Sequence, residues 1–325
     1  MQEAMIARAK ELLKDGSVNR VIGWKKGEFS YDISPAVFTT PEQLDAEFVY
    51  DDFCGANVSK YVMKEAKKEG KVLAFIKPCD SYSFAQLLKE HRFDREKVYA
   101  IGIPCYGKAD IAKIREKGID GVLGIREEGS NFVIDSIYGD ATVAKCDVLA
   151  ERCLNCKSKK HVDVDEMLGE EGEWNNESGR FDEVARLEAM TPDERYEFWR
   201  GELSRCIRCN ACRNVCPACT CENCVFDNPN SDINNKAAAT SFEENMYHII
   251  RAFHVAGRCT DCGECSRVCP QNIPIHLLNR KFIKDINELY GEYQAGANPE
   301  ERYPLVNFNY GDCEPGIVYK RGGNQ

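Results

Sequence analysis

The sequence contains no run of eighteen apolar residues and no excess of positive charge. The first absence excludes a membrane-spanning helix, which needs about 20 such residues. The second argues against a nucleic-acid partner, because 43 Lys and Arg residues face 53 Asp and Glu residues and the formal net charge is −10. No basic field is available to attract phosphates. The dinucleotide motif Gly-x-Gly-x-x-Gly is also missing.

The N-terminal segment lacks the apolar stretch of a secretory signal. Residues 1–14 mix charged and apolar side chains at helical spacing, so we expect an amphipathic helix there and a cytoplasmic protein. A reducing cytoplasm disfavours disulfides. The chain nevertheless has 18 cysteines among 325 residues, and metal binding is the main remaining reason for so many thiols.

The cysteines divide the chain into two parts. Six are spread over residues 1–160, eleven form dense groups within 206–269, and Cys313 stands alone near the end. Acidic residues, Gly and Asn are frequent between the parts. We therefore predict four regions, which are a first domain over 1–161, an acidic linker over 162–190, a second domain over 191–285 and a tail over 286–325.

Apolar runs of strand length alternate with helical patterns in the first domain. The runs are 71–77 and 97–103, and the helical segments are 81–90 and 109–117. This alternation predicts an α/β domain with a partly parallel sheet, to which residues 121–145 add short antiparallel strands. The second domain has helical patterns at 191–203 and 242–255 and should be mainly helical. The predicted fold is thus multidomain, of the α+β class.

Two copies of the pattern C-x2-C-x2-C-x3-C-P occur in the second domain. At this spacing three cysteines bind one [4Fe–4S] cluster and the fourth binds the other. We assign Cys206, Cys209, Cys212 and Cys269 to cluster 1. We assign Cys259, Cys262, Cys265 and Cys216 to cluster 2. Paired cysteines also bind zinc, but two complete runs that each end in Cys-Pro favour iron–sulfur clusters.

A segment with a helical pattern, residues 243–258, leads directly into the second run. This arrangement resembles the helical dicluster ferredoxin domain of heterodisulfide reductase and of succinate dehydrogenase iron–sulfur subunits. His248 and His254 are six residues apart and do not share a helix face as metal ligands would. We expect them to have packing or surface roles.

The two predicted strands of the first domain repeat one pattern. Residues 71–79 and 97–105 match at Lys, Val, Ala, Pro and Cys, and each ends in Pro-Cys. Neighbouring parallel strands would carry Cys79 and Cys105 to the carboxyl edge of the sheet, where open α/β sheets bind ligands. Cys153 and Cys156 would complete a third [4Fe–4S] cluster, cluster 3. The alternative is that these cysteines are ordinary core residues.

Short motifs around these cysteines resemble a known family. Lys77-Pro-Cys-Asp80, Ile103-Pro-Cys-Tyr-Gly107 and Cys153-Leu-Asn-Cys156 are similar to motifs of the β-subunit family of deazaflavin-reducing hydrogenases and formate dehydrogenases. The resemblance covers about residues 45–170 and implies that the four cysteines hold a [4Fe–4S] cluster beside an FAD. Lys77 and Asp80 flank Cys79 and are candidates for binding the FAD, and a plain ion pair is the alternative.

Six cysteines lie outside these three sets. The dense group Cys219, Cys221 and Cys224 suggests a fourth cluster, with Cys54 as a candidate fourth ligand. Cys146 and Cys313 are expected to be free thiols.

Three or four clusters on one chain form a path for electrons, and no constellation of catalytic residues accompanies them. We therefore predict an electron-transfer subunit of an anaerobic oxidoreductase complex, similar to formate dehydrogenase, hydrogenase or heterodisulfide reductase, rather than a stand-alone enzyme. Its partners would be a catalytic subunit and a redox partner such as a ferredoxin, a flavoprotein or a heterodisulfide-reductase-like subunit. The alternative is an FAD-containing dehydrogenase subunit that itself exchanges hydride with a deazaflavin or NAD(P)H. A redox sensor without turnover is a third interpretation.

Overall fold

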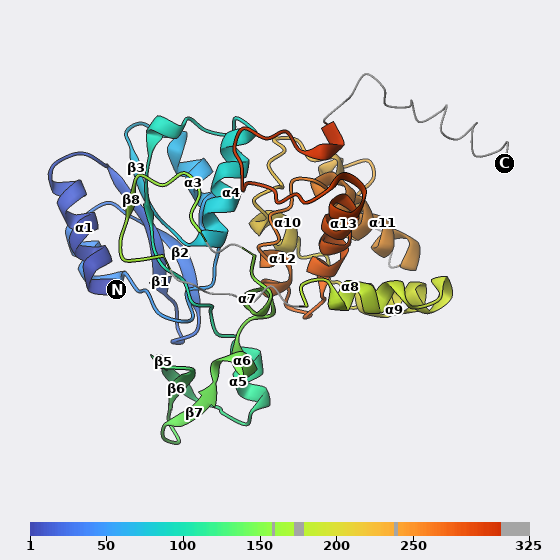
Figure 1. Ribbon diagram of the computed structural model, residues 1–325, viewed down its shortest axis with the longest axis horizontal. Helices are drawn as coiled ribbons and strands as arrows, with labels where there is room; N and C mark the ends of the chain where they lie inside the picture. The colour runs from blue at the N-terminus through green and yellow to red at the C-terminus, as the bar shows by residue number, and fades with distance from the viewer. Residues whose placement is uncertain (158–159, 172–178, 237–239, 307–325) are drawn as a thin grey trace.

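The structure is a computed structural model that describes residues 1–157, 160–171, 179–236 and 240–306. Figure 1 shows two parts side by side, a sheet with its helices from the N-terminal half and a group of helices from the C-terminal half. A small second sheet extends from the lower side of the first part (Figure 1).

The main sheet has five strands in the order β2-β1-β3-β4-β8. Their bounds are β1 (Arg20–Lys26), β2 (Ile33–Phe38), β3 (Val72–Ile76), β4 (Val98–Gly102) and β8 (Glu166–Met167). β1, β3, β4 and β8 run parallel, and β2 joins the edge antiparallel to β1. Every residue of β3 is buried, as expected for a central parallel strand covered on both faces. The predicted partly parallel sheet is confirmed.

Helices accompany this sheet in the order α1 (Gln2–Lys14), α2 (Pro41–Glu47), α3 (Ser59–Ala66), α4 (Pro78–Lys89), the 3-10 turn η1 (Arg95–Lys97) and α5 (Ile111–Glu116). α4 begins directly after β3. Pro78 occupies its first position, where a proline fits because its fixed φ suits a helix and no N–H is needed. Cys79 therefore lies in the first turn of α4, close to the end of β3.

The small sheet is an antiparallel meander, as predicted for residues 121–145. It consists of β5 (Val122–Glu128), β6 (Asn131–Ser136) and β7 (Ala141–Ala144). Two short helices, α6 (Lys145–Val148) and α7 (Glu151–Leu154), lead from it back to the main sheet. In Figure 1, α7 lies between the main sheet and the C-terminal helices.

The region predicted as an acidic linker is more ordered than its composition indicated. It contains β8, which extends the main sheet, and α8 (Asp182–Glu188). Two of its acidic side chains are ion-paired, since Glu166 contacts Arg8 over 2.9 Å and Asp163 contacts Arg95 over 2.9 Å. These long-range pairs attach residues 163–167 to the N-terminal part.

The C-terminal part is built from α8, α9 (Pro192–Ser204), α10 (Ala211–Val215), α11 (Ser241–Val255), α12 (Glu264–Arg267) and α13 (Ile275–Tyr290). Three 3-10 turns complete the secondary structure, η2 (Val225–Asp227), η3 (Ile233–Asn235) and η4 (Pro304–Val306). After β8 the described residues form no further strand, in agreement with the mainly helical prediction. α13 continues past the predicted domain end at 285. No helix in the described ranges is long and apolar enough to cross a membrane.

Candidate metal centres

Two neighbouring strands carry cysteines to the same edge of the main sheet. β3 and β4 pair in parallel with Val72 opposite Val98 and Ile76 opposite Gly102, which is the offset of 26 residues seen in the repeated sequence pattern. Cys79 lies in the first turn of α4, and Cys105 lies in the loop after β4. Both cysteines are therefore at the carboxyl edge of the sheet, the expected place for a ligand.

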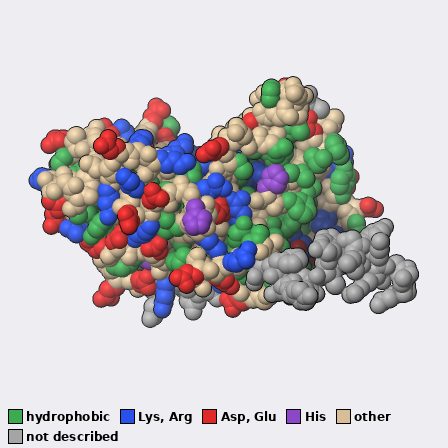
Figure 2. Space-filling view, turned by 90° about the horizontal axis from the view of Figure 1, so that it is seen from above, with side chains coloured by type: hydrophobic (Ala, Val, Ile, Leu, Met, Phe, Trp, Pro, Cys, Tyr) green, Lys and Arg blue, Asp and Glu red, His purple; other side chains and the backbone are tan. Residues whose placement is uncertain are grey.

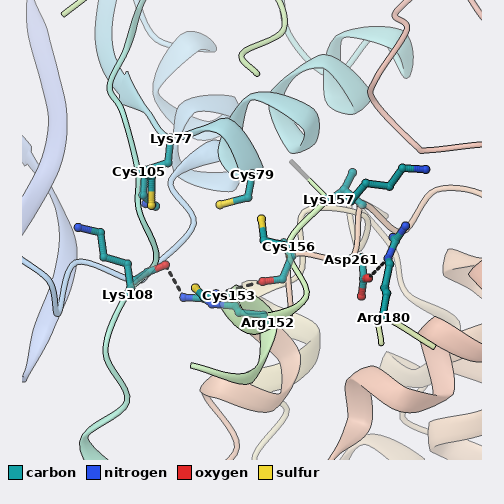
Figure 3. A pocket seen from close by; sticks show the side chains of 13 residues that line it. Lys77, Cys79, Cys105, Lys108, Arg152, Cys153, Cys156, Lys157, Arg180 and Asp261 are labelled. Carbon is teal, nitrogen blue, oxygen red and sulfur yellow. Dashed lines mark hydrogen bonds and ion pairs between the residues drawn. The ribbon is translucent and has the colours of Figure 1, made fainter. Parts of the chain in front are cut away.

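A cavity at this edge is lined by all four cysteines assigned to cluster 3, namely Cys79, Cys105, Cys153 and Cys156. We call it the sheet-edge cavity. Figure 3 shows the four sulfur atoms turned toward the same space. The structure thus brings together two strand ends and the segment around α7, which are distant in the sequence.

Positive charge surrounds these thiols. The basic residues that line the sheet-edge cavity are Lys77, Lys108, Lys157, Arg152 and Arg180. Burial raises the pKa of Cys79, and the adjacent Lys77 opposes that rise. Burial likewise raises the pKa of Cys153, and Arg152 opposes it. Because nearby cations favour the thiolate, which is the form that binds iron, this donor set fits a [4Fe–4S] cluster.

Lys77 and Asp80, the residues considered for FAD, form a buried ion pair of 2.7 Å between Nζ and Oδ2. The Lys77 ammonium also donates to the carbonyl of Ala56 and lies 4.2 Å from the centre of the Trp24 ring. Burial raises the pKa of Asp80, and Lys77 opposes this rise. The structure therefore gives both residues the ion-pair role named as the alternative, although Lys77 also lines the sheet-edge cavity.

The two ferredoxin runs share one backbone conformation. Arg208 and Asp261 follow the first cysteine of each run by two residues and have φ values of 52° and 58°. Asn210 and Gly263 follow it by four residues, with φ values of 60° and 66°. Asn and Gly are the residues that most readily adopt such left-handed geometry. These repeated turns bend each run so that its cysteines surround a common space.

The ligand sets assigned from the sequence are brought together by the structure. One cavity is lined by Cys206, Cys209, Cys212 and Cys269. In the other set, Cys216 and Cys265 are buried, and Cys259 and Cys262 are partly exposed. Burial raises the pKa of three thiols of this set, and the Cys216 thiol adds to the rise at Cys259, Cys262 and Cys265.

The cysteines do not converge on single points. In the described ranges, no three or more His, Cys, Asp and Glu side chains are arranged to hold a single metal ion.

Two polar side chains, one on α11 and one on α13, approach cysteine sulfurs. The His248 ring nitrogen Nε2 lies 3.3 Å from Cys206 Sγ, and the Asn279 amide lies 3.7 Å from Cys265 Sγ. Burial, reinforced by neighbouring arginines, lowers the pKa of His248 to about 3, so its ring is neutral. Sequence reasoning gave His248 a packing or surface role and missed this contact. The only available signal was its place on the buried face of α11, three residues before the buried Arg251. His254, by contrast, is exposed.

The sheet-edge cavity and the second run share a boundary. Cys262, assigned to cluster 2, also lines the sheet-edge cavity. Arg152 donates to the carbonyl of Cys262 over 3.1 Å and pairs with the buried Glu264. Of the two ferredoxin sets, the one that contains Cys262 therefore adjoins the sheet-edge cavity.

The leftover cysteines are separated from one another. Cys219, Cys221 and Cys224 line a cavity of their own. Cys54 does not join them, because it is buried in the N-terminal part with its sulfur 3.6 Å from the carbonyl of Val49. The structure therefore does not bring Cys54 together with Cys219, Cys221 and Cys224. Cys146 is exposed, and Cys313 lies outside the described residues.

Comparison with known proteins supports the ferredoxin sites. Residues 202–273 match the family model of the 4Fe-4S dicluster domain. The match spans both cysteine runs and the insert between them. It supports [4Fe–4S] clusters in the C-terminal part and agrees with the resemblance drawn from the spacing.

Similarity to curated relatives extends over nearly the whole chain. The β subunit of the F420-dependent formate dehydrogenase of Methanocaldococcus jannaschii is 23% identical, with 89% of this chain and 90% of that protein covered. The β subunit of F420-dependent formate dehydrogenase 1 of Methanococcus maripaludis is 24% identical, with 91% of each covered. The resemblance to this family is thus confirmed and is wider than residues 45–170.

Among solved structures, a chain of the F420-reducing [NiFe] hydrogenase complex of Methanosarcina barkeri is 15% identical. It covers 47% of this chain and 58% of its own length, with a TM-score of 0.37. Together, the dicluster domain and the curated relatives support an iron–sulfur electron-transfer subunit.

Proposed function

We propose that this chain relays electrons through three [4Fe–4S] clusters inside an oxidoreductase complex of the formate dehydrogenase or hydrogenase kind. One-electron transfer is the chemistry that such clusters supply when bound. The observation that carries the proposal is the contiguity of the three cysteine sets, since Cys262 belongs to the second run and also lines the sheet-edge cavity. A continuous row of sites is what a relay requires.

The surrounding side chains have two tasks in this proposal. Arg152 joins the segment that carries Cys153 to the loop that carries Cys262. It thereby fixes the position of cluster 3 relative to cluster 2. His248 and Asn279 place N–H groups near cluster ligands. Hydrogen bonds to cysteine sulfurs raise the reduction potential of a cluster because they stabilise its more negative state.

Partners follow from the relay. An electron relay needs a donor and an acceptor, and both relatives are named as β subunits of formate dehydrogenases. We therefore propose a catalytic subunit as one partner and a ferredoxin, a flavoprotein or a heterodisulfide-reductase-like subunit as the other. The cytoplasm is the proposed location.

A second candidate function keeps an FAD on the chain, with direct hydride exchange with a deazaflavin or NAD(P)H. The observation that favours it is the F420-dependence in the relatives' names. FAD content of the anoxically purified chain separates the two proposals. The second one also requires that reduced deazaflavin or NAD(P)H bleach the clusters without any partner protein.

The relay is tested by iron analysis and electron paramagnetic resonance of the reduced protein. We expect the three sets to contribute about twelve irons per chain, and Cys79→Ser or Cys105→Ser to remove about four while both ferredoxin signals persist. Serine is a harder ligand than cysteine and suits iron–sulfur sites poorly. Cys146→Ser, at an exposed thiol, should keep every signal. If Cys79→Ser and Cys105→Ser both retain the parent's iron and spectra, cluster 3 does not exist.

A further inference from the structure

Three cysteines outside clusters 1 to 3 line a second cavity, together with many charged side chains, and such a lining is typical of a ligand site. Cys219, Cys221 and Cys224 lie on the loop between α10 and η2, at C-x-C-x2-C spacing, and all three line it. Cys221 is exposed, and the other two are partly exposed. We call this space the basic cavity, because of the side chains opposite the thiols.

Positive charge dominates the basic cavity although the whole chain is acidic. Its basic lining residues are Lys60, Lys64, Lys67, Arg213, Arg251 and Arg258, and its acidic ones are Glu222 and Asp227. Lys60 and Lys64 lie on α3 in the N-terminal part and Lys67 directly follows that helix, whereas the arginines come from the C-terminal part. In the view of Figure 2, Lys and Arg side chains gather around the hollow between the two parts.

Arg251 connects this cavity with the neighbouring cysteine sets. It is only 2% exposed, and its Nη1 atom lies 3.9 Å from the sulfur of Cys219. The thiols of Cys212, Cys216 and Cys265 also lie close enough to interact with its charge. Because a buried charge is costly unless it is compensated, thiolates at these positions are the partners that stabilise it.

The cysteine loop is also tied to the neighbouring centre. The backbone N–H of Cys219 donates to the carbonyl of Cys216 over 3.1 Å, and Cys216 is assigned to cluster 2. Lys60 holds the loop from the other side, since its ammonium donates to the carbonyl of Cys219 over 2.8 Å and to that of Arg213 over 3.3 Å. The basic cavity therefore begins where cluster 2 ends and opens to the surface at Cys221.

We propose that the basic cavity holds a fourth iron–sulfur cluster, bound by Cys219, Cys221 and Cys224. Soft thiolate ligands select such clusters, zinc or Cu(I). We choose an iron–sulfur cluster among these because the loop directly follows Cys216, which is assigned to cluster 2, and all three thiols line one cavity beside it. The arginines and lysines compensate the negative charge of the thiolates. The inference rests on the proposed relay, which it extends from cluster 2 to the protein surface.

The test uses the full chain, purified without oxygen, and counts iron, acid-labile sulfide and zinc. Cys219 stays in place because it contacts Cys216, and Cys221 and Cys224 are replaced together by serine. We expect about sixteen irons in the parent and a loss of about four in Cys221→Ser/Cys224→Ser, with the other clusters' resonance signals unchanged. Cys146→Ser is the matched control and should keep the parent's iron.

The outcomes separate the two proposals. About twelve irons in both the parent and the double variant would overturn the fourth cluster and leave the three-cluster relay standing. Fewer than about twelve irons in the parent would count against the relay itself, and the fourth cluster would fall with it. One zinc per chain that is lost only in the double variant would refute the iron–sulfur assignment.

Discussion

Replacing Glu264 by glutamine should weaken the junction between the two parts of the molecule. Glu264 is 1% exposed and is paired with Arg152 and Arg267, whose side chains are 10% and 35% exposed. Glutamine keeps the size of the side chain and removes its charge. Breaking a buried ion pair typically costs about 3–5 kcal/mol, because the remaining charge loses its compensation.

The lower end of that range applies here. Arg152 keeps two other acceptors, the carbonyls of Gly55 at 2.6 Å and of Cys262 at 3.1 Å, and Arg267 reaches water. We therefore expect the free energy of unfolding to fall by about 3 kcal/mol. With an m-value of about 3 kcal/mol/M, the urea midpoint should fall by about 1 M.

The assay is urea unfolding of the iron-loaded protein without oxygen, followed by both circular dichroism and cluster absorbance. Glu197→Gln is the matched control, because Glu197 makes the same kind of pair with Arg200 at side-chain exposures of 56% and 52%. Exposed pairs contribute about 0–1 kcal/mol. If Glu264→Gln shifts the midpoint no more than Glu197→Gln does, the Arg152–Glu264 pair does not stabilise the junction.

Three further predictions concern stability and assembly. Thr191→Ala removes the side chain that accepts a hydrogen bond from Glu194 N at the start of α9, and thermal or urea unfolding should show a loss of about 1 kcal/mol. Burial lowers the pKa of His276 to about 4, so protonation favours the unfolded chain below about pH 6.5, and stability should fall by about 2 kcal/mol from pH 7 to pH 5. His276→Asn should flatten that pH dependence of the urea midpoint, and an unchanged slope would contradict the assignment. Native material should sediment in a complex heavier than the 36.8 kDa chain, and a monomer peak would count against the partner subunits.

The parts of the structure that local patterns define were predictable from the sequence. The repeated strand pattern predicted that β3 and β4 pair in parallel. In the sheet, each residue of the first copy lies opposite the matching residue of the second copy. The ferredoxin spacing gave the two cysteine sets of the C-terminal part. In each case the signal lies within one short segment or in a direct repeat.

Features that depend on distant residues escaped the prediction. β1 and β2 were missed because Gly23 and Pro35 interrupt their strand patterns, and Pro35 is tolerated because β2 lies at the edge of the sheet. β8 was missed because its acidic surroundings are balanced by Arg8 and Arg95. The approach of Asn279 to Cys265 depends on how α13 packs, which no spacing within the chain reveals.

The shared lining of the sheet-edge cavity has a consequence for biogenesis. One wall comes from the strand ends and α7, and another comes from the loop of Thr260, Asp261 and Cys262. The lining of the cavity is complete only when both parts of the molecule have docked. On the proposed function, cluster 3 would take all four of its ligands from the N-terminal part, so its assembly would not require docking, and the C-terminal loop would add its wall of the cavity afterwards.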